Sequence, residues 1–280
     1  MTPDSDLSSS PYQSNDPSLG GSDVALHPTP ELSPRPKLED PPWNGWDVLL
    51  LVAATIGASF VLSIAVVSGA RVLLYPHLSW FDVAKIPELI LLSQFLAYIV
   101  VLLIMYRLLT TRTGKFWDTL QWRWPGSAWS GYIAAGALVF LVLASIGRLL
   151  PIPKSLPIDR FFENARQAVI MSVFAVAIAP LMEELFFRGF LYPVLARRFG
   201  MGFSIVFTAV AFALLHGSQL QFSWAAVLII FVVGVVLTTV RAITRSVAAS
   251  FLLHVGYNLS ISAGLLLVTG GFRHLERLNR

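Results

Sequence analysis

The sequence contains no cysteine and few charged residues. The lack of cysteine excludes thiol catalysis, thiolate metal sites, disulfides and lipidation of this chain on a cysteine. Only 13% of the 280 residues are charged, whereas soluble domains carry about 25%. The basic residues, which give a formal net charge of +4, are scattered at the ends of apolar runs rather than clustered. This scatter argues against a nucleic-acid partner.

Long apolar runs dominate the rest of the sequence. Hydrophobic residues make up 55% of the chain, and the mean hydropathy is +0.69. A helix that crosses a bilayer needs about 20 predominantly apolar residues. We therefore predict an all-α, polytopic protein embedded in the lipid bilayer. Seven transmembrane helices are expected, at residues 46–67, 86–109, 131–150, 168–197, 203–216, 222–240 and 247–268. An eighth, interfacial or re-entrant helix between residues 151 and 166 is the alternative.

Composition divides the chain into four parts. Residues 1–42 are rich in Ser, Pro, Asp and Gly, so they cannot bury enough apolar surface to fold and are expected to form a disordered tail. Residues 43–129 hold the first two spans and a Trp-rich link, and residues 130–270 hold the remaining spans. Residues 271–280 form a basic C-terminal stub. Clusters of basic residues in the short loops favour a cytoplasmic N-terminus.

Three charges interrupt the fourth span. Glu183, Glu184 and Arg188 lie in a run that is otherwise apolar, and each charge costs roughly 2.5–3.5 kcal/mol at the centre of a membrane helix. Residues four apart share a helix face, so Glu184 and Arg188 can pair as a buried ion pair. Glu183 is rotated by about 100° from its neighbour. It is therefore the carboxylate left free to point elsewhere.

Two further spans carry polar residues at a matching depth. His216 ends the fifth span, and the seventh contains His254 and Asn258, which share a helix face. Glu183, His216 and Asn258 each lie about 20 Å from the same membrane side. His254 lies about 14 Å from it, roughly one helical turn away. We therefore expect these side chains to converge on one cavity.

The residue types alone leave three functions open. A carboxylate next to an imidazole can hold and deprotonate a water, which is general-base catalysis. A second imidazole and an amide can stabilise a developing oxyanion. Intramembrane Glu and His residues are equally typical of proton or ion carriers. Polar side chains can also join helices in a membrane protein that only binds a partner.

Taken together, the polar residues form three motifs in chain order. They are EExxxR (Glu183, Glu184, Arg188), FxxxH (Phe212, His216) and HxxxN (His254, Asn258). This set resembles the CPBP family, also known as the Abi domain. That family comprises intramembrane endopeptidases such as the type II CAAX prenyl proteases, together with bacteriocin-immunity proteins. The resemblance covers residues 130–270, which would form the catalytic membrane domain.

The resemblance implies a role for each motif residue. Glu183 and His216 would activate the hydrolytic water, and His254 with Asn258 would form the oxyanion-stabilising side. The supporting residues would be Glu184 and Arg188, which brace the site, and Phe212, which shapes the pocket. The implied activity is hydrolysis of peptide bonds in membrane-anchored substrates, including prenylated CAAX-type ones. A non-catalytic binding or immunity protein is the alternative, and a proton or ion carrier the less favoured one.

The need for a metal is a separate question. Members of the CPBP family are often described as metalloproteases, and Glu183, His216 and His254 could hold Zn²⁺ with a water in the fourth position. The HExxH spacing of soluble zinc proteases is absent from the sequence. We therefore favour a water that is activated without a metal, with zinc as the alternative.

Overall fold

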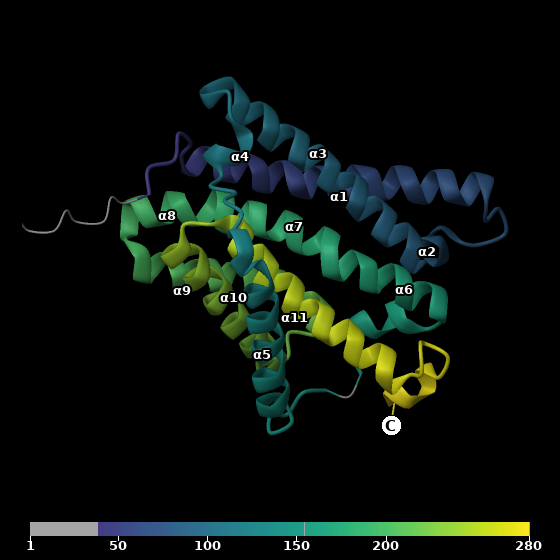
Figure 1. The fold of residues 1–280 in the computed structure, drawn as a ribbon. Helices are drawn as coiled ribbons and strands as arrows, with labels where there is room; N and C mark the ends of the chain where they lie inside the picture. The colour runs from purple at the N-terminus through teal and green to yellow at the C-terminus, as the bar shows by residue number, and fades with distance from the viewer. Residues whose placement is uncertain (1–38, 154, 280) are drawn as a thin grey trace, which may run out of the picture. The chain divides into compact units, whose positions relative to one another are not determined.

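The computed structural model describes residues 39–153 and 155–279, and these form helices joined by turns, with no strand among them (Figure 1). The α-helices are α1 (Gly45–Leu73), α2 (Trp80–Val83), α3 (Pro87–Thr113), α4 (Phe116–Thr119), α5 (Trp129–Gly147), α6 (Ala165–Val173), α7 (Ala179–Glu183), α8 (Tyr192–Phe199), α9 (Met201–Leu215), α10 (Trp224–Thr244) and α11 (Val247–Val268). Short 3-10 helices occupy Gly126–Ala128, Pro157–Phe162, Gly217–Leu220 and Leu275–Asn279. The predicted all-α class is therefore confirmed.

Local sequence explains where several of these helices begin and end. Asn44 caps α1, because its side chain accepts from the backbone N–H of Asp47 while Asp47 accepts from the N–H of Asn44. Ser246 caps α11 with a single bond, because its hydroxyl accepts from the backbone N–H of Ala249. Gly114, with φ of 72°, ends α3 in a left-handed conformation that glycine adopts without strain.

The number of spans differs from the predicted seven. Six helices in the described part of the chain are long and apolar enough to cross a membrane, judged by length and composition. The fifth predicted span, residues 203–216, corresponds to α9, which has only 15 residues. Such a helix is about 22 Å long and falls short of a core of about 30 Å. Between residues 151 and 166, where an interfacial or re-entrant eighth helix is the alternative, the described residues form the short 3-10 helix Pro157–Phe162.

Helices α6, α7 and α8 form one continuous element of 35 residues, Ala165–Phe199, which Figure 1 shows as a single line of green ribbon. Two π-helical segments join its α-helical parts, at Phe174–Ile178 and Glu184–Leu191. A π segment bonds each N–H to the carbonyl five residues earlier, and such segments are frequent at functional sites. The second one carries the charged motif.

A proline follows the first π segment and leaves a carbonyl without its helical donor. The N–H of Ala179 bonds the oxygen of Phe174, five residues earlier. In the same register, the oxygen of Ala175 would be bonded by residue 180, which is a proline and has no N–H. Ala175 therefore needs a donor from outside its own helix.

The second π segment repeats this arrangement. The N–H of Tyr192 bonds the oxygen of Phe187. The next oxygen in that register, that of Arg188, would be bonded by residue 193, which is again a proline. Arg188 therefore carries both a buried guanidinium and a carbonyl that needs a donor from another helix.

Helix α11 is held by a close approach to α5, which it crosses in Figure 1. A Cβ atom on Gly256 would overlap the carbonyl of Ile133, and one on Gly136 would overlap the carbonyl of Leu253. Two glycines therefore let the backbones of the two helices touch, as small residues do between membrane helices. Because Gly256 lies between His254 and Asn258 in the sequence, this contact also fixes the polar residues of α11.

Of the predicted tail over residues 1–42, only residues 39–42 are described, and the rest lies outside the described part of the chain. These four residues make specific contacts with the helices. Glu39 pairs with Arg241 at 2.9 Å, and Asp40 pairs with Arg197 at 3.3 Å. The part of the chain that packs on the helices therefore begins by Glu39, ahead of the expected boundary at residue 42.

Candidate active site

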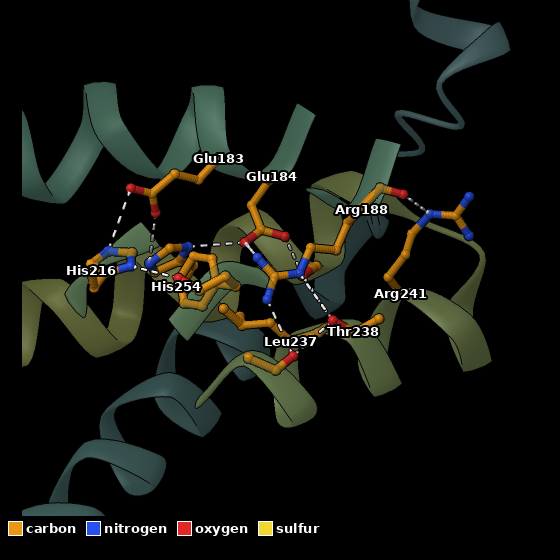
Figure 2. Close-up of polar contacts among 11 residues, drawn as sticks. Glu183, Glu184, Arg188, His216, Leu237, Thr238, Arg241 and His254 are labelled. Atoms are coloured by element: carbon orange, nitrogen blue, oxygen red, sulfur yellow. Dashed lines mark hydrogen bonds and ion pairs between the residues drawn. The ribbon is translucent and has the colours of Figure 1, made fainter. Parts of the chain in front are cut away.

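The free carboxylate lies between two imidazoles (Figure 2). Glu183 ends α7, His216 caps the C-terminus of α9, and His254 lies in α11. Nε2 of His216 is 3.8 Å from Oε1 of Glu183, and Nε2 of His254 is 3.7 Å from Oε2. The side chains of Glu183 and His216 keep 13% and 20% of their exposure. The structure thus brings together three residues whose convergence the sequence predicts.

The hydrogen bond of Nδ1 determines which ring nitrogen of His216 carries the proton. Nδ1 lies 2.9 Å from the carbonyl oxygen of Phe212, one turn earlier in α9. A carbonyl oxygen only accepts, so Nδ1 must donate. In a neutral ring Nε2 then bears the lone pair, and it points at Glu183. The helix geometry of FxxxH therefore supplies a fixed acceptor.

His254 is anchored in the same sense, by a side chain instead of the backbone. Its Nδ1 donates to Oε1 of Glu184 at 3.0 Å. Its Nε2 faces Glu183, as does that of His216. Two acceptor nitrogens and a carboxylate that face one another repel unless a proton or a hydrogen-bond donor lies between them. The arrangement is therefore suited to hold a proton or a water.

Glu184, the adjacent carboxylate, is enclosed by donors. It is fully buried, and its Oε1 accepts from Nη1 of Arg188 at 3.0 Å as well as from His254. Its Oε2 accepts from the hydroxyl of Ser250 at 2.5 Å. The predicted pairing of Glu184 with Arg188 is present, and three charged or polar partners offset the cost of burying this carboxylate.

Arg188 is likewise fully buried, and each of its three guanidinium nitrogens donates a hydrogen bond. Its Nε donates to the hydroxyl of Thr238 at 3.2 Å, and its Nη2 donates to the carbonyl of Gly234 at 3.2 Å. Its guanidinium lies 4.5 Å from the ring centroid of Phe212. That ring also packs on His216, with centroids 4.8 Å apart. Phe212 therefore lies between the Glu184–Arg188 ion pair and the imidazole of His216. This position agrees with the expected packing role of Phe212.

Asn258 shares a helix face with His254, which suggests that both reach the same atoms, but its hydrogen bond goes elsewhere. Its Nδ2 donates to the carbonyl oxygen of Ala175 at 2.8 Å. This is the oxygen that Pro180 leaves without a helical donor. His254 thus reaches the two glutamates, while Asn258 bonds the backbone of the first π segment. This bond gives Asn258 a structural role beside any chemical one.

Sequence reasoning missed three buried residues of this cluster, Ser250, Thr238 and Arg241. Ser250 could have been found, because it precedes His254 by one helical turn and shares its face. Thr238 and Arg241 belong to α10, in which the sequence offers no motif. Arg241 is one of the basic residues at the end of an apolar run, and nothing in the sequence indicates that it is completely buried.

The donor types of the site are ones that zinc accepts, but their arrangement does not fit a metal centre. Within residues 39–153 and 155–279, no group of three or more His, Asp or Glu side chains is placed to hold a metal ion. The Nδ1 bonds orient both rings, as they also do in metal-ligating histidines, and each Nε2 faces a separate oxygen of Glu183 at 3.7–3.8 Å without forming such a group. The structure therefore gives no support to a metalloprotease.

Part of this region is similar to a known protein family. Residues 165–260 match the model of the Rce1-like type II CAAX prenyl endopeptidases. The matched segment contains every residue of the three motifs, so the predicted resemblance is confirmed over this part of the chain. No curated protein and no solved structure matches the chain. The match and the six apolar helices together indicate an integral membrane protein related to proteases.

Proposed function

We propose that this protein is an intramembrane endopeptidase in which Glu183 activates a water to hydrolyse a peptide bond. The observation that carries the proposal is the carboxylate of Glu183 facing Nε2 of both His216 and His254, at 3.8 and 3.7 Å. Polar groups at such separations are commonly bridged by water. Both imidazoles are oriented by their Nδ1 bonds, so the site is preorganised for a small polar reactant.

Charge balance supports this assignment. The cluster contains two carboxylates, Glu183 and Glu184, and one guanidinium, that of Arg188. In a buried site a net negative charge is costly, and one additional proton on the group of Glu183, His216 and His254 removes it. We place this proton on His254, because its ring lies between both carboxylates. His254 then presents its Nε2–H toward Glu183 and the reactant, and Glu183 stays a base.

Hydrolysis follows from these protonation states. Glu183 takes a proton from the water as its oxygen bonds to the carbonyl carbon of the substrate, while His216 accepts the water's other hydrogen bond. The electron pair of the carbonyl moves to its oxygen, and the N–H of His254 stabilises that oxyanion. When the oxyanion collapses, the C–N bond breaks and the leaving amine takes the proton from Glu183. The products are a carboxylic acid and a free amine.

Asn258 contributes a second donor in this scheme. An amide nitrogen carries two N–H groups, and one of them is used on the carbonyl of Ala175. The other remains for the oxyanion. The bond to Ala175 would hold the amide in place, as a group that orients a donor does in other hydrolases.

The substrate is a peptide already held in the membrane. Glu183 lies in the continuous helix Ala165–Phe199, which is long and apolar enough to cross a bilayer. A peptide tethered by a lipid or a membrane segment would reach the site without leaving the bilayer. The match to type II CAAX prenyl endopeptidases supports CAAX-type, prenylated peptides as the first class to test.

The test is cleavage of a prenylated peptide by the purified protein in liposomes. We expect Glu183→Gln and His216→Gln each to lower kcat by about 10²–10⁴-fold. Glu276→Gln is the matched control, because Glu276 forms an exposed Glu–His contact with His274 at 3.1 Å outside the site, and it should cleave normally.

Two outcomes would overturn the proposal. Cleavage by Glu183→Gln at the wild-type rate would remove Glu183 from the chemistry. If instead no peptide is cut and the same variants abolish proton flux across the liposome membrane, the cluster serves a proton carrier.

A further inference from the structure

The carbonyl that Pro193 leaves without a helical donor is bonded by a residue of another helix. Nε of Arg241, in α10, donates to the carbonyl oxygen of Arg188 at 3.1 Å (Figure 2). Arg241 is completely buried, although it lies near the C-terminal end of its helix. This bond satisfies a backbone oxygen that would otherwise be buried without a partner.

Glu39 holds Arg241 in that position. Nη1 and Nη2 of Arg241 donate to the two carboxylate oxygens of Glu39, at 2.9 and 3.4 Å. Gln121 also donates to Glu39, at 2.9 Å. The guanidinium lies 5.4 Å from the ring centroid of Tyr192. An arginine can make both contacts at once, because its Nη1 and Nη2 groups bond the carboxylate of Glu39 while its Nε–H remains for the carbonyl of Arg188.

The residues next to Glu39 bind the helix Ala165–Phe199, which also carries Arg188, at points after the candidate site. We call residues 39–43 the N-terminal strap. Trp43 stacks on Phe190, with centroids 4.8 Å apart, and its indole N–H donates to the carbonyl of Phe190 at 2.8 Å. Arg197 donates to the carbonyls of Pro41 and Trp43, at 2.9 and 3.1 Å. The strap is therefore attached to the segment that follows the candidate site.

We propose that Glu39 and Arg241 are positioning residues for the candidate active site, acting through the backbone of Arg188. This inference rests on the proposed function for the chemistry that it positions. The path begins with three contacts: Glu39 pairs with Arg241, Arg241 bonds the carbonyl of Arg188, and the Arg188 guanidinium pairs with Glu184. Glu184 in turn bonds His254.

Because Arg188 lies in a π segment, the orientation of Glu183 and Glu184 depends on the bond from Arg241. A π turn contains one residue more than an α turn, and one residue corresponds to about 100° of rotation around the helix. Without the donor from Arg241, Glu184–Leu191 loses a bond that stabilises its π form. A return to α geometry would rotate Glu183 and Glu184 relative to Pro193 and the strap. The imidazoles, which belong to other helices, would not follow.

Two double variants test the proposal, and in each of them both members of one ion pair are replaced by neutral residues. The test variant is Glu39→Gln with Arg241→Met. The control is Asp47→Asn with Arg112→Met, which removes a similar pair: Arg112 bonds both oxygens of Asp47 at 2.8 Å and the carbonyl of Pro42 at 3.0 Å. Both variants are read out by hydrogen exchange of the peptide covering residues 184–192, by thermal unfolding in detergent and by peptide cleavage.

The expected results separate positioning from general stability. Both variants should lower the unfolding temperature. Only Glu39→Gln with Arg241→Met should speed exchange in residues 184–192, and only this variant should lower kcat, by about 10-fold or more at unchanged KM. Equal exchange in the two variants, or an equal loss of kcat, would overturn the proposal.

A single substitution covers the case in which the double variant does not fold. Arg241→Lys keeps a positive charge beside Glu39 but removes the separate Nε–H that bonds Arg188. It should lower the unfolding temperature less than the double variant does and still exchange faster in residues 184–192, and wild-type exchange would overturn the proposal. Exchange needs no substrate, so a protein that cuts no peptide would refute the proposed function while leaving the positioning result decided.

Discussion

Two adjacent glutamates of one helix have opposite surroundings. The oxygens of Glu184 accept from Arg188, His254 and Ser250 at 2.5–3.0 Å, and its side chain is completely buried. The oxygens of Glu183 face two imidazole nitrogens at 3.7 and 3.8 Å, and its side chain is partly exposed. One peptide unit therefore separates a carboxylate with satisfied acceptors from one that is placed to act on a reactant.

This contrast explains how a membrane helix can carry three charges. Glu184 and Arg188 are mutually neutralised, and the hydroxyls and carbonyls of neighbouring helices meet their remaining atoms. Glu183 contributes least to that network, so its carboxylate is the one whose replacement the fold should tolerate. Structure and chemistry are divided between neighbouring residues because successive helical positions point about 100° apart.

The same substitution at both positions is the strongest way to break this comparison. Glu184→Gln leaves Arg188 as a buried charge without its partner, so we expect it to lower the free energy of unfolding by about 3–5 kcal/mol. Glu183→Gln should change it by less than about 1 kcal/mol. Unfolding of both purified variants in detergent measures the difference.

Yield provides a second reading of that pair. Glu184→Gln should be recovered in much lower amounts from membranes, whereas Glu183→Gln should be recovered like the wild type. The division of roles would be wrong if Glu183→Gln unfolded more readily than Glu184→Gln.

The next largest effect concerns the helix that presents His254. Gly256→Ala would place a methyl group on the carbonyl of Ile133, so α5 and α11 would have to separate. Overpacking of this kind costs about 1–3 kcal/mol. Gly264→Ala, on the same helix, meets nothing within 4 Å and is the control.

Thermal unfolding and cleavage should respond together in Gly256→Ala, because a displaced α11 moves His254 away from Glu183. A variant with normal stability and normal turnover would show that the close approach of the two helices is not needed to hold the site.

Much of this arrangement follows from the sequence. The spacing of Glu184 and Arg188 predicts their pairing, and the matched depths of Glu183 and His216 predict that these residues meet. Such inferences succeed because helical periodicity and membrane thickness are fixed. The fifth span shows the limit: an apolar run predicts a helix, but α9 ends after 15 residues at Leu215.

The contacts that complete the site could not be predicted in this way. The bond from Asn258 to Ala175 joins residues 83 apart, and the bond from Arg241 to Arg188 joins residues 53 apart. Pro180 and Pro193 indicate that a helical N–H donor is missing, but they do not indicate which side chain replaces it. That choice depends on how helices pack, for which a single sequence contains no local pattern.

A smaller effect is expected where Glu184 loses only one of its donors. Ser250→Ala removes the hydroxyl that bonds Oε2 of Glu184, and we expect a loss of about 1–2 kcal/mol in unfolding free energy. Ser260→Ala, on the same helix, removes only a bond to the carbonyl of Gly256 and should cost less than about 0.5 kcal/mol.

Denaturation of the two serine variants in parallel measures this difference. Equal losses would mean that the hydroxyl of Ser250 adds nothing to the burial of Glu184 beyond an ordinary helix bond. The contrast between the two glutamates would then rest on Arg188 and His254 alone.

The smallest effect should come from metal removal. A catalytic zinc needs its protein ligands at about 2.0–2.2 Å from one point with an open fourth position. In the described residues the two imidazoles each face a different oxygen of Glu183 and form no metal-holding group with it. We therefore expect 1,10-phenanthroline to leave cleavage by the reconstituted protein unchanged, with elemental analysis of the same sample as the control. Stoichiometric zinc, together with a loss of cleavage that added zinc restores, would replace the water held by Glu183 with a metal-bound one and would make Glu183 a ligand instead of a base.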